Sequence, residues 1–97
     1  MKKKLERFAE VGTFSNVFQK DCTLKGKWNQ DYFKNHQPIV LELGCGRGEY
    51  SVALSKLFPE KNFIGVDVKG NRIWRGAKTG IEENLVNLAY LRAQIES

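Results

Sequence analysis

The feature that most constrains the fold of this chain is the run Ile39–Gly48, in which an apolar segment opens into three alternating glycines. Glycine adopts positive φ readily and lets the backbone approach a ligand more closely than a side chain would allow. A second apolar run follows at 62–68 and carries Asp67 near its carboxyl end. The pattern predicts a strand, a glycine turn, a helix and a second parallel strand, with a ligand site at the turn.

The spacing of the glycines and the positions of two acids indicate which ligand this turn accepts. Dinucleotide sites use G-x-G-x-x-G, whereas Gly48 arrives one residue early and Glu42 lies two residues before Gly44. A carboxylate there would repel a pyrophosphate and attract a cationic amine. We therefore expect S-adenosylmethionine rather than NAD, with Glu42 at the methionyl end and Asp67 at the ribose hydroxyls. The alternative is that the glycines serve only to pack the helix against the strand.

From Ile39 onward the sequence predicts the order β-α-β-α-β in an α/β fold. We expect helices at 49–58 and 72–84, and further strands at 62–68 and 88–92. Right-handed crossovers would place the three strands in the spatial order 3-2-1, with the ligand at their carboxyl ends. The apolar residues that the two helices are expected to bury are Tyr50, Ala53, Leu54, Leu57, Phe58, Ile73, Ala77 and Ile81.

Residues 1–38 are interpreted as a basic amino-terminal extension ahead of a domain at 39–97. They hold eight Lys and Arg against four Asp and Glu, whereas 39–97 holds eight against seven. Such an arm suits RNA, because phosphate contacts supply affinity without reading sequence; the alternative is that the lysines only keep the protein in solution. Apolar spacing from Leu5 to Phe18 predicts a short amphipathic helix interrupted at Gly12. The candidate RNA contacts of the extension are Lys2, Lys3, Lys4, Arg7, Lys25 and Lys27.

Further basic residues lie at and after the end of the second predicted strand. Lys69 and Arg72 fall at the rim of the expected site and are candidate substrate or cofactor contacts. Arg75 and Lys78 share the outer arc of the next helix with two glutamates, a mixture typical of a solvated face.

Composition narrows the class of protein. No apolar run approaches the ~20 residues of a membrane span, and the amino terminus lacks the apolar stretch of a signal peptide, so we expect a cytoplasmic protein. The two cysteines, Cys22 and Cys45, supply neither a metal quartet nor a disulfide framework. We expect no metal site.

Together these segments resemble the tRNA (guanine-N7-)-methyltransferases, a family of class I S-adenosylmethionine-dependent enzymes. The resemblance implies a Rossmann-like class I methyltransferase fold. It implies transfer of a methyl group from S-adenosylmethionine to N7 of a guanosine in the variable loop of tRNA. The matching segments are Leu5–Phe8, Gly26–Trp28, Ile39–Gly48, Gly65–Lys69 with Arg72, and Asn87–Arg92.

The resemblance also implies roles for individual residues. Glu42, Gly44, Gly46 and Asp67 would contact S-adenosylmethionine, and Gln94 stands where the family usually has an acid near the adenine. An amide can still bond the adenine edge. Guanine N7 has a free lone pair and no proton to lose, so we expect no catalytic nucleophile and no general base.

The chain stops before a fourth strand of this fold. The substrate-binding motif of the family, an aspartate-proline segment, follows that strand, so only the first half of the fold is expected and activity of these 97 residues alone is doubtful. One edge of the first strand would then lack a partner, which predicts self-association or a partner subunit at that edge. Two alternatives remain: another class I methyltransferase, and a non-catalytic module that binds cofactor or RNA.

Overall fold

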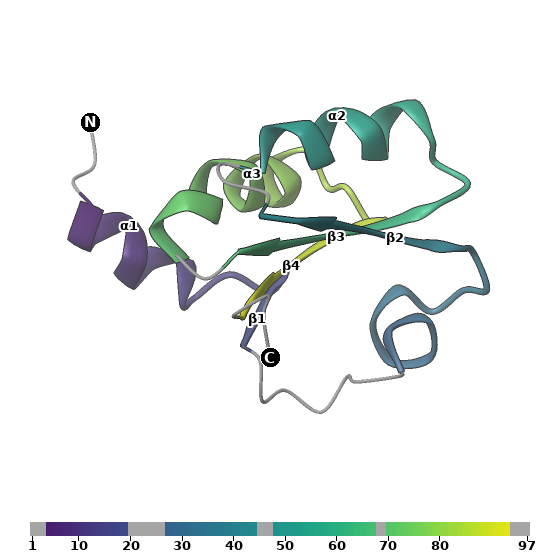
Figure 1. The fold of residues 1–97 in the computed structure, drawn as a ribbon, viewed down its shortest axis with the longest axis horizontal. Coiled ribbons are helices and arrows are strands. Elements are labelled where there is room, and N and C mark those ends of the chain that lie inside the picture. The colour runs from purple at the N-terminus through teal and green to yellow at the C-terminus, as the bar shows by residue number, and fades with distance from the viewer. Residues whose placement is uncertain (1–3, 20–26, 45–47, 68–69, 94–97) are drawn as a thin grey trace.

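The computed structural model describes residues 4–19, 27–44, 48–67 and 70–93. In these ranges the chain forms helices and parallel strands that alternate along the sequence (Figure 1). The helical elements are α1 (Lys4–Val11), the π-helix η1 (Trp28–Phe33), α2 (Glu49–Leu57) and α3 (Gly70–Glu82). The strands are β1 (Val17–Gln19), β2 (Ile39–Leu43), β3 (Asn62–Asp67) and β4 (Leu88–Arg92).

The strands form one parallel sheet in the order β1-β4-β3-β2. The three strands expected from the sequence are β2, β3 and β4, and their predicted order is confirmed. The sequence does not predict β1: the amphipathic helix expected from Leu5 to Phe18 ends at Val11, just before Gly12, and Phe18 lies in a strand. Val17 pairs with Tyr90 on β4, so tertiary pairing decides the conformation of a segment whose apolar spacing also suits a helix.

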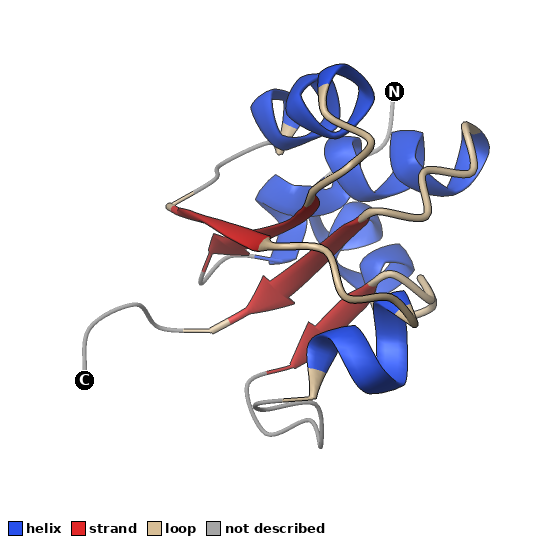
Figure 2. Ribbon diagram, turned by 90° about the vertical axis from the view of Figure 1, so that its right-hand side faces the viewer, coloured by secondary structure: helices blue, strands red, loops and turns tan. Residues whose placement is uncertain are grey.

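Helices cover both faces of this sheet. α2 and α3 lie on one face and η1 lies on the other, as Figures 1 and 2 show from two directions. Alternate residues of β3 therefore enter two different cores: Phe63 packs with Ile73 of α3, and Ile64 packs with Phe33 of η1. The strand predicted at 62–68 is confirmed at 62–67, where every residue of β3 is buried, as a strand covered on both faces requires. Val68 lies outside the described residues.

The buried face of α2 differs from the prediction. Tyr50 and Leu57 are 64% and 70% exposed, and the buried residues are Ser51, Val52 and Ser55. The Ser55 hydroxyl returns a 2.8 Å hydrogen bond to the Val52 carbonyl, so the serines are satisfied polar groups on the side that faces α3, β3 and β4. Of the residues that apolar periodicity placed on the buried face, Leu54 is partly buried against this core, as predicted. The others are exposed: Tyr50, Ala53, Leu57 and Phe58.

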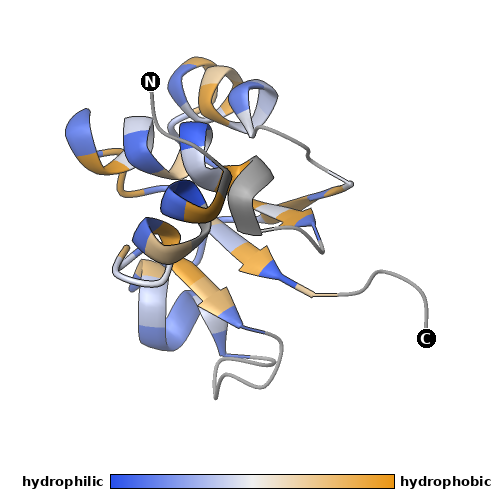
Figure 3. Ribbon diagram, turned by 90° about the vertical axis from the view of Figure 1, so that its left-hand side faces the viewer, coloured by the Kyte–Doolittle hydropathy of each residue, from blue (hydrophilic) through white to orange (hydrophobic). Residues whose placement is uncertain are grey.

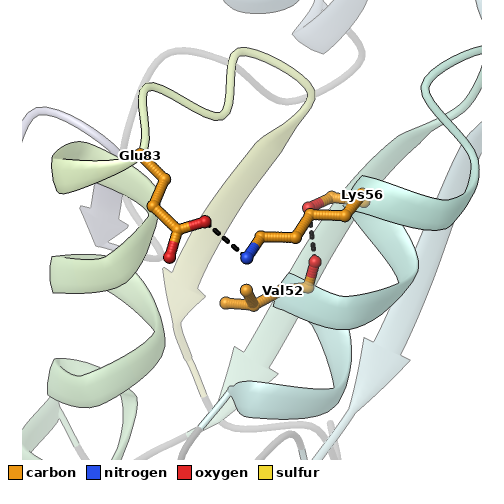
Figure 4. A network of polar contacts seen from close by, with 4 residues as sticks. Val52, Lys56 and Glu83 are labelled. Carbon is orange, nitrogen blue, oxygen red and sulfur yellow. Dashed lines mark hydrogen bonds and ion pairs between the residues drawn. The ribbon is translucent and has the colours of Figure 1, made fainter.

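An ion pair also joins α2 to the end of α3. Figure 4 shows Lys56 reaching Glu83 across the gap between the two helices. On α3 itself, Ile73 and Ala77 are fully buried as predicted, but Ile81 is 43% exposed. Trp74 is buried in its place, because α3 also packs against α1.

Two parts of the predicted extension are attached to the rest of the molecule by polar contacts. The indole Nε1 of Trp74 donates a 2.7 Å hydrogen bond to Glu10 on α1, and Asn16 donates one of 3.0 Å to the carbonyl of Ala77. On the other face, Asn62 donates hydrogen bonds of 2.8 and 2.7 Å to Asn29 and Asn35. In the described ranges no helix has the length and apolarity that crossing a membrane requires.

Candidate functional site

The candidate site is built on the turn between β2 and α2. Gly44 and Gly48 both have left-handed backbone conformations, with φ of 66° and 78°. Gly48 is the N-cap of α2, and its carbonyl accepts a 2.6 Å hydrogen bond from the hydroxyl of Tyr90 and one of 3.2 Å from the amide of Val52. The sequence prediction of a strand, a glycine turn and a helix is confirmed at these residues.

Glu42 lies within β2, two residues before the turn. Its carboxylate accepts a hydrogen bond from the hydroxyl of Ser51 in the first turn of α2. This bond orients the Glu42 side chain toward the α2 side of the sheet. Glu42 is half-buried, so a ligand could still reach the carboxylate.

Asp67 is the last residue of β3 and is 4% exposed. Its carbonyl accepts a 3.0 Å hydrogen bond from the amide of Ala93, and the register pairs it with Arg92 at the end of β4. Leu43 of β2 pairs with Val66 of β3, so Gly44 and Asp67 follow at the same level of the sheet. The fold thus brings Glu42, Gly44 and Asp67 to one region, at the carboxyl ends of neighbouring strands.

Two residues of this edge were missed by the sequence reasoning. Arg92 Nη1 donates a 3.1 Å hydrogen bond to Gln19 Oε1, which joins the ends of β4 and β1. Arg92 could have been found, because the predicted strand 88–92 ends on it and parallel strands end at a common edge. Gln19 carried no such signal, because the sequence does not predict β1.

The remaining predicted contacts are placed less directly. Arg72 lies in the first turn of α3, next to the carboxyl end of β3, and only its backbone is described. Lys27 is exposed and precedes Trp28, which packs on the η1 face of the sheet, away from α2. Of the other predicted contacts, Arg7 lies on α1 with its guanidinium near the ring of Trp74, and only the backbone of Lys4 is described. The rest lie outside the described residues: Lys2, Lys3, Lys25, Gly46, Lys69 and Gln94.

This arrangement defines a class of protein. A Rossmann-like nucleoside-binding fold combines a parallel sheet, a glycine turn after its first βα strand and acids at the carboxyl ends of adjacent strands, and these parts are present here.

The comparison with solved structures agrees. One described as "Structure of an antibiotic related Methyltransferase" superposes with a TM-score of 0.55 at 20% identity, over 100% of this chain and 39% of its own. The antibiotic-resistance methyltransferase Kmr superposes with a TM-score of 0.52 at 14% identity, over 100% of this chain and 40% of its own. At these identities the likeness concerns the fold, which is that of the class I methyltransferases.

Sequence comparison defines the family. Residues 36–96 match the family model described as "Putative methyltransferase". A tRNA (guanine-N(7)-)-methyltransferase of Christiangramia forsetii is 56% identical over 98% of this chain and 46% of its own length. The protein of the same name from Bacteroides fragilis is 48% identical over 98% of this chain and 41% of its own length. The chain belongs to the tRNA (guanine-N7-)-methyltransferase family, as the sequence motifs indicated, and it spans less than half the length of these curated relatives.

Proposed function

We propose that this chain is the cofactor-binding part of an S-adenosylmethionine-dependent tRNA (guanine-N7-)-methyltransferase. One observation carries the proposal: Gly44, with its left-handed φ, lies at the carboxyl edge of the sheet beside two acids, Glu42 and Asp67, on adjacent strands. The relatives that match almost the whole chain are named for the same reaction. The whole enzyme's tRNA specificity is part of the proposal.

The residues present fit S-adenosylmethionine. Glu42 is a partly exposed carboxylate that can accept hydrogen bonds from the amine of the methionyl group. Asp67 stands at the end of the next strand, the position from which an acid bonds ribose hydroxyls. Gly44, with no side chain and a left-handed φ, lets the ligand approach the backbone. Gly46 and Gln94 are proposed contacts on sequence grounds.

When bound, the cofactor supplies an electrophilic methyl group on its sulfonium. Held by Glu42, Gly44 and Asp67, it would supply this methyl group to the lone pair of guanine N7, and the positive charge of the sulfonium would pass to the base. Because N7 carries no proton, the protein has none to remove. Its residues therefore contribute positioning and an electrostatic setting for the arriving charge.

Binding of the demethylated product tests the cofactor assignment. We expect calorimetric titration with S-adenosylhomocysteine to saturate, and titration with NAD to give no binding. Asp67→Ala should weaken S-adenosylhomocysteine binding at least tenfold, because the ribose hydroxyls lose a charged acceptor. Unchanged affinity in that variant would overturn the ribose assignment.

Methyl transfer tests the reaction. The whole protein should transfer a labelled methyl group from S-adenosylmethionine to a tRNA transcript. The matched control is the same transcript with 7-deazaguanosine in place of the variable-loop guanosine, which removes only the accepting nitrogen. Equal incorporation into both transcripts would exclude N7 as the acceptor and favour another class I methyltransferase activity.

The proposed RNA contacts of this chain are Lys25, Lys27, Lys69 and Arg72. Of these, Lys27 is an exposed side chain on the η1 face. Glutamine substitutions there should weaken tRNA binding without changing the affinity for S-adenosylhomocysteine, since phosphate contacts contribute to affinity for the RNA alone. A protein that handles tRNA is expected in the cytoplasm.

A further inference from the structure

Three cationic side chains from two helices gather over the indole ring of Trp74. The guanidinium carbon of Arg7, on α1, lies 5.1 Å from the ring centroid. On α3, the guanidinium carbon of Arg75 lies 5.8 Å from it and Lys78 Nζ lies 4.9 Å from it. Because all three charged groups lie near one ring centroid, no two of them are farther apart than twice the longest of these distances. We call Arg7, Trp74, Arg75 and Lys78 the Trp74 patch.

The ring of Trp74 is fixed in place between the two helices. It is 8% exposed, and its Nε1 donates a 2.7 Å hydrogen bond to Glu10 on α1. A cation over an aromatic face is attracted by the negative charge of the ring face. The tryptophan thus holds side chains from α1 and α3 in one place, although the sequence separates Arg7 widely from Arg75 and Lys78.

The charges of the patch are not balanced by acids that pair with them. Lys56 on α2 pairs with Glu83, but within the described ranges none of the three patch cations forms an ion pair. The Nε of Arg7 is buried and has no hydrogen-bond acceptor. Like charges held this close repel one another, and the single carboxylate of Glu10 at the indole offsets only part of the three positive charges. An anionic ligand would relieve the remaining repulsion.

The patch borders the candidate site. Trp74 is the fifth residue of α3, which begins just beyond the carboxyl end of β3, so it lies about 6 Å along the helix. Figure 3 views the molecule from this end. Arg75 also lines a pocket of about 370 Å³ between α2 and α3, together with Glu49, Lys56 and Thr79. An anionic chain could therefore run along the helices toward the edge where Asp67 lies.

We propose that the Trp74 patch binds backbone phosphates of the RNA substrate and holds that strand beside the carboxyl edge of the sheet. Arginine forms paired hydrogen bonds with phosphate, and lysine adds a point charge. That this ligand is the tRNA substrate rests on the proposed function. It assigns a role to Arg75 and Lys78, whose mixture with glutamates on one helical arc is otherwise typical of a solvated face.

The test compares two double variants of the whole protein that lose the same charge. Arg75→Gln/Lys78→Gln removes two cations of the patch. Lys34→Gln/Lys61→Gln removes two cations elsewhere, one at the end of η1 and one over the ring of Phe58. Binding of a tRNA transcript is measured by filter retention from 50 to 300 mM salt. Unfolding curves and S-adenosylhomocysteine titrations confirm that both variants are folded.

We expect the patch variant to bind the transcript at least tenfold more weakly than the control variant at low salt. The plot of log K against log salt should also be less steep for the patch variant. The magnitude of its slope should decrease by about 0.7 to 0.9 for each phosphate that the variant no longer neutralises. Equal affinity and equal slope in the two variants would overturn the proposal. This outcome differs from a failure of the proposed function. If the proposed function were wrong, the unmodified protein would not transfer a methyl group to tRNA, whereas the patch is tested by RNA binding alone.

Discussion

The hydroxyl of Tyr90, on β4, donates a 2.6 Å hydrogen bond to the carbonyl of Gly48, at the end of the glycine turn. The register places Gly65 of β3 between Tyr90 on one side and Glu42 on the other. The tyrosine therefore crosses β3 at a residue that has no side chain. Tyr90, which is fully buried on β4, thus holds the glycine turn that follows β2.

Tyr90→Phe should destabilise the protein by about 1 to 2 kcal/mol, because it removes one buried hydrogen bond and leaves the ring in place. The Gly48 carbonyl would keep only its bond from the Val52 amide. Urea unfolding measures the stability, and we expect weaker binding of S-adenosylhomocysteine under folding conditions, because β4 no longer supports the turn. Unchanged stability together with unchanged binding would show that the bond does not hold the turn.

Gly48→Ala should be more damaging. A Cβ on Gly48 would lie 2.6 Å from Tyr90 Cε1, and the residue has a φ of 78°, which L-residues rarely adopt. We expect the free energy of unfolding to fall by at least about 2 kcal/mol.

Gly12→Ala is the matched control for this substitution. A Cβ there would meet only the Ala9 carbonyl, at 3.4 Å, which is ordinary contact. We expect a change within about 1 kcal/mol. Equal effects of the two substitutions would mean that neither the backbone conformation nor the approach of Tyr90 constrains Gly48.

How far the sequence predicts the fold depends on which residues carry the signal. The strand at 88–92 has the bounds expected of it, and the glycine turn can be recognised, because apolar runs, glycines and prolines act locally. Periodicity fails for α2, where the buried residues include Ser51 and Ser55. Their burial depends on hydrogen bonds to Glu42 and to the Val52 carbonyl, which a hydropathy pattern does not contain. β1 escapes prediction because a three-residue strand gains its stability from β4 and not from its own sequence.

The sequence predicts the site in outline for the same reason. Parallel strands end at one edge, so the positions of Glu42, Gly44 and Asp67 in the sequence are enough to bring them together. The Arg92–Gln19 hydrogen bond depends on β1, which adds to the far side of β4. No local pattern indicates that pairing.

Asn62 supports a further prediction about the η1 face. It is fully buried and donates to both Asn29 and Asn35, which fixes η1 against the start of β3. Asn62→Ala should cost about 2 to 3 kcal/mol, because Asn29 Oδ1 loses the donor Asn62, Asn35 Oδ1 keeps only its bond from the Gln37 amide, and Asn35 Nδ2 loses its acceptor. Urea unfolding measures it, with Gln30→Ala on the exposed side of η1 as the control. A destabilisation no larger than that of the control would show that the asparagine cluster does not anchor η1.

Tyr32 makes stability depend on pH in the alkaline range. Burial raises the pKa of its hydroxyl above the ordinary value of 10.0, and the hydroxyl donates a 3.3 Å hydrogen bond to the Leu88 carbonyl. Above pH 10 the unfolded chain releases this proton more readily than the folded chain does. The contribution of Tyr32 to the free energy of unfolding is therefore fully present below pH 10. It is lost as the pH rises toward the pKa of the folded state. Tyr32→Phe should reduce the fall in unfolding free energy between pH 9 and pH 11; the same fall in both proteins would exclude Tyr32 as its source.

The exposed edge of the sheet predicts association between copies of the 97-residue chain. In the described part of the structure β2 pairs only with β3, and Leu41 and Leu43 are 58% and 59% exposed. An apolar edge strand offers unpaired backbone groups and apolar area to another chain. Sedimentation should therefore show a species that grows with concentration, and Leu41→Lys/Leu43→Lys should shift it toward the monomer.

The control for this association is Val86→Lys, which charges a residue that is 75% exposed in the loop before β4. This variant should associate as the unmodified chain does, because β2 is unchanged. A monomer at every concentration would contradict the prediction. If Val86→Lys reduced the association as much as Leu41→Lys/Leu43→Lys, the reduction would be due to net charge. Both changes add positive charge to a protein that is already basic.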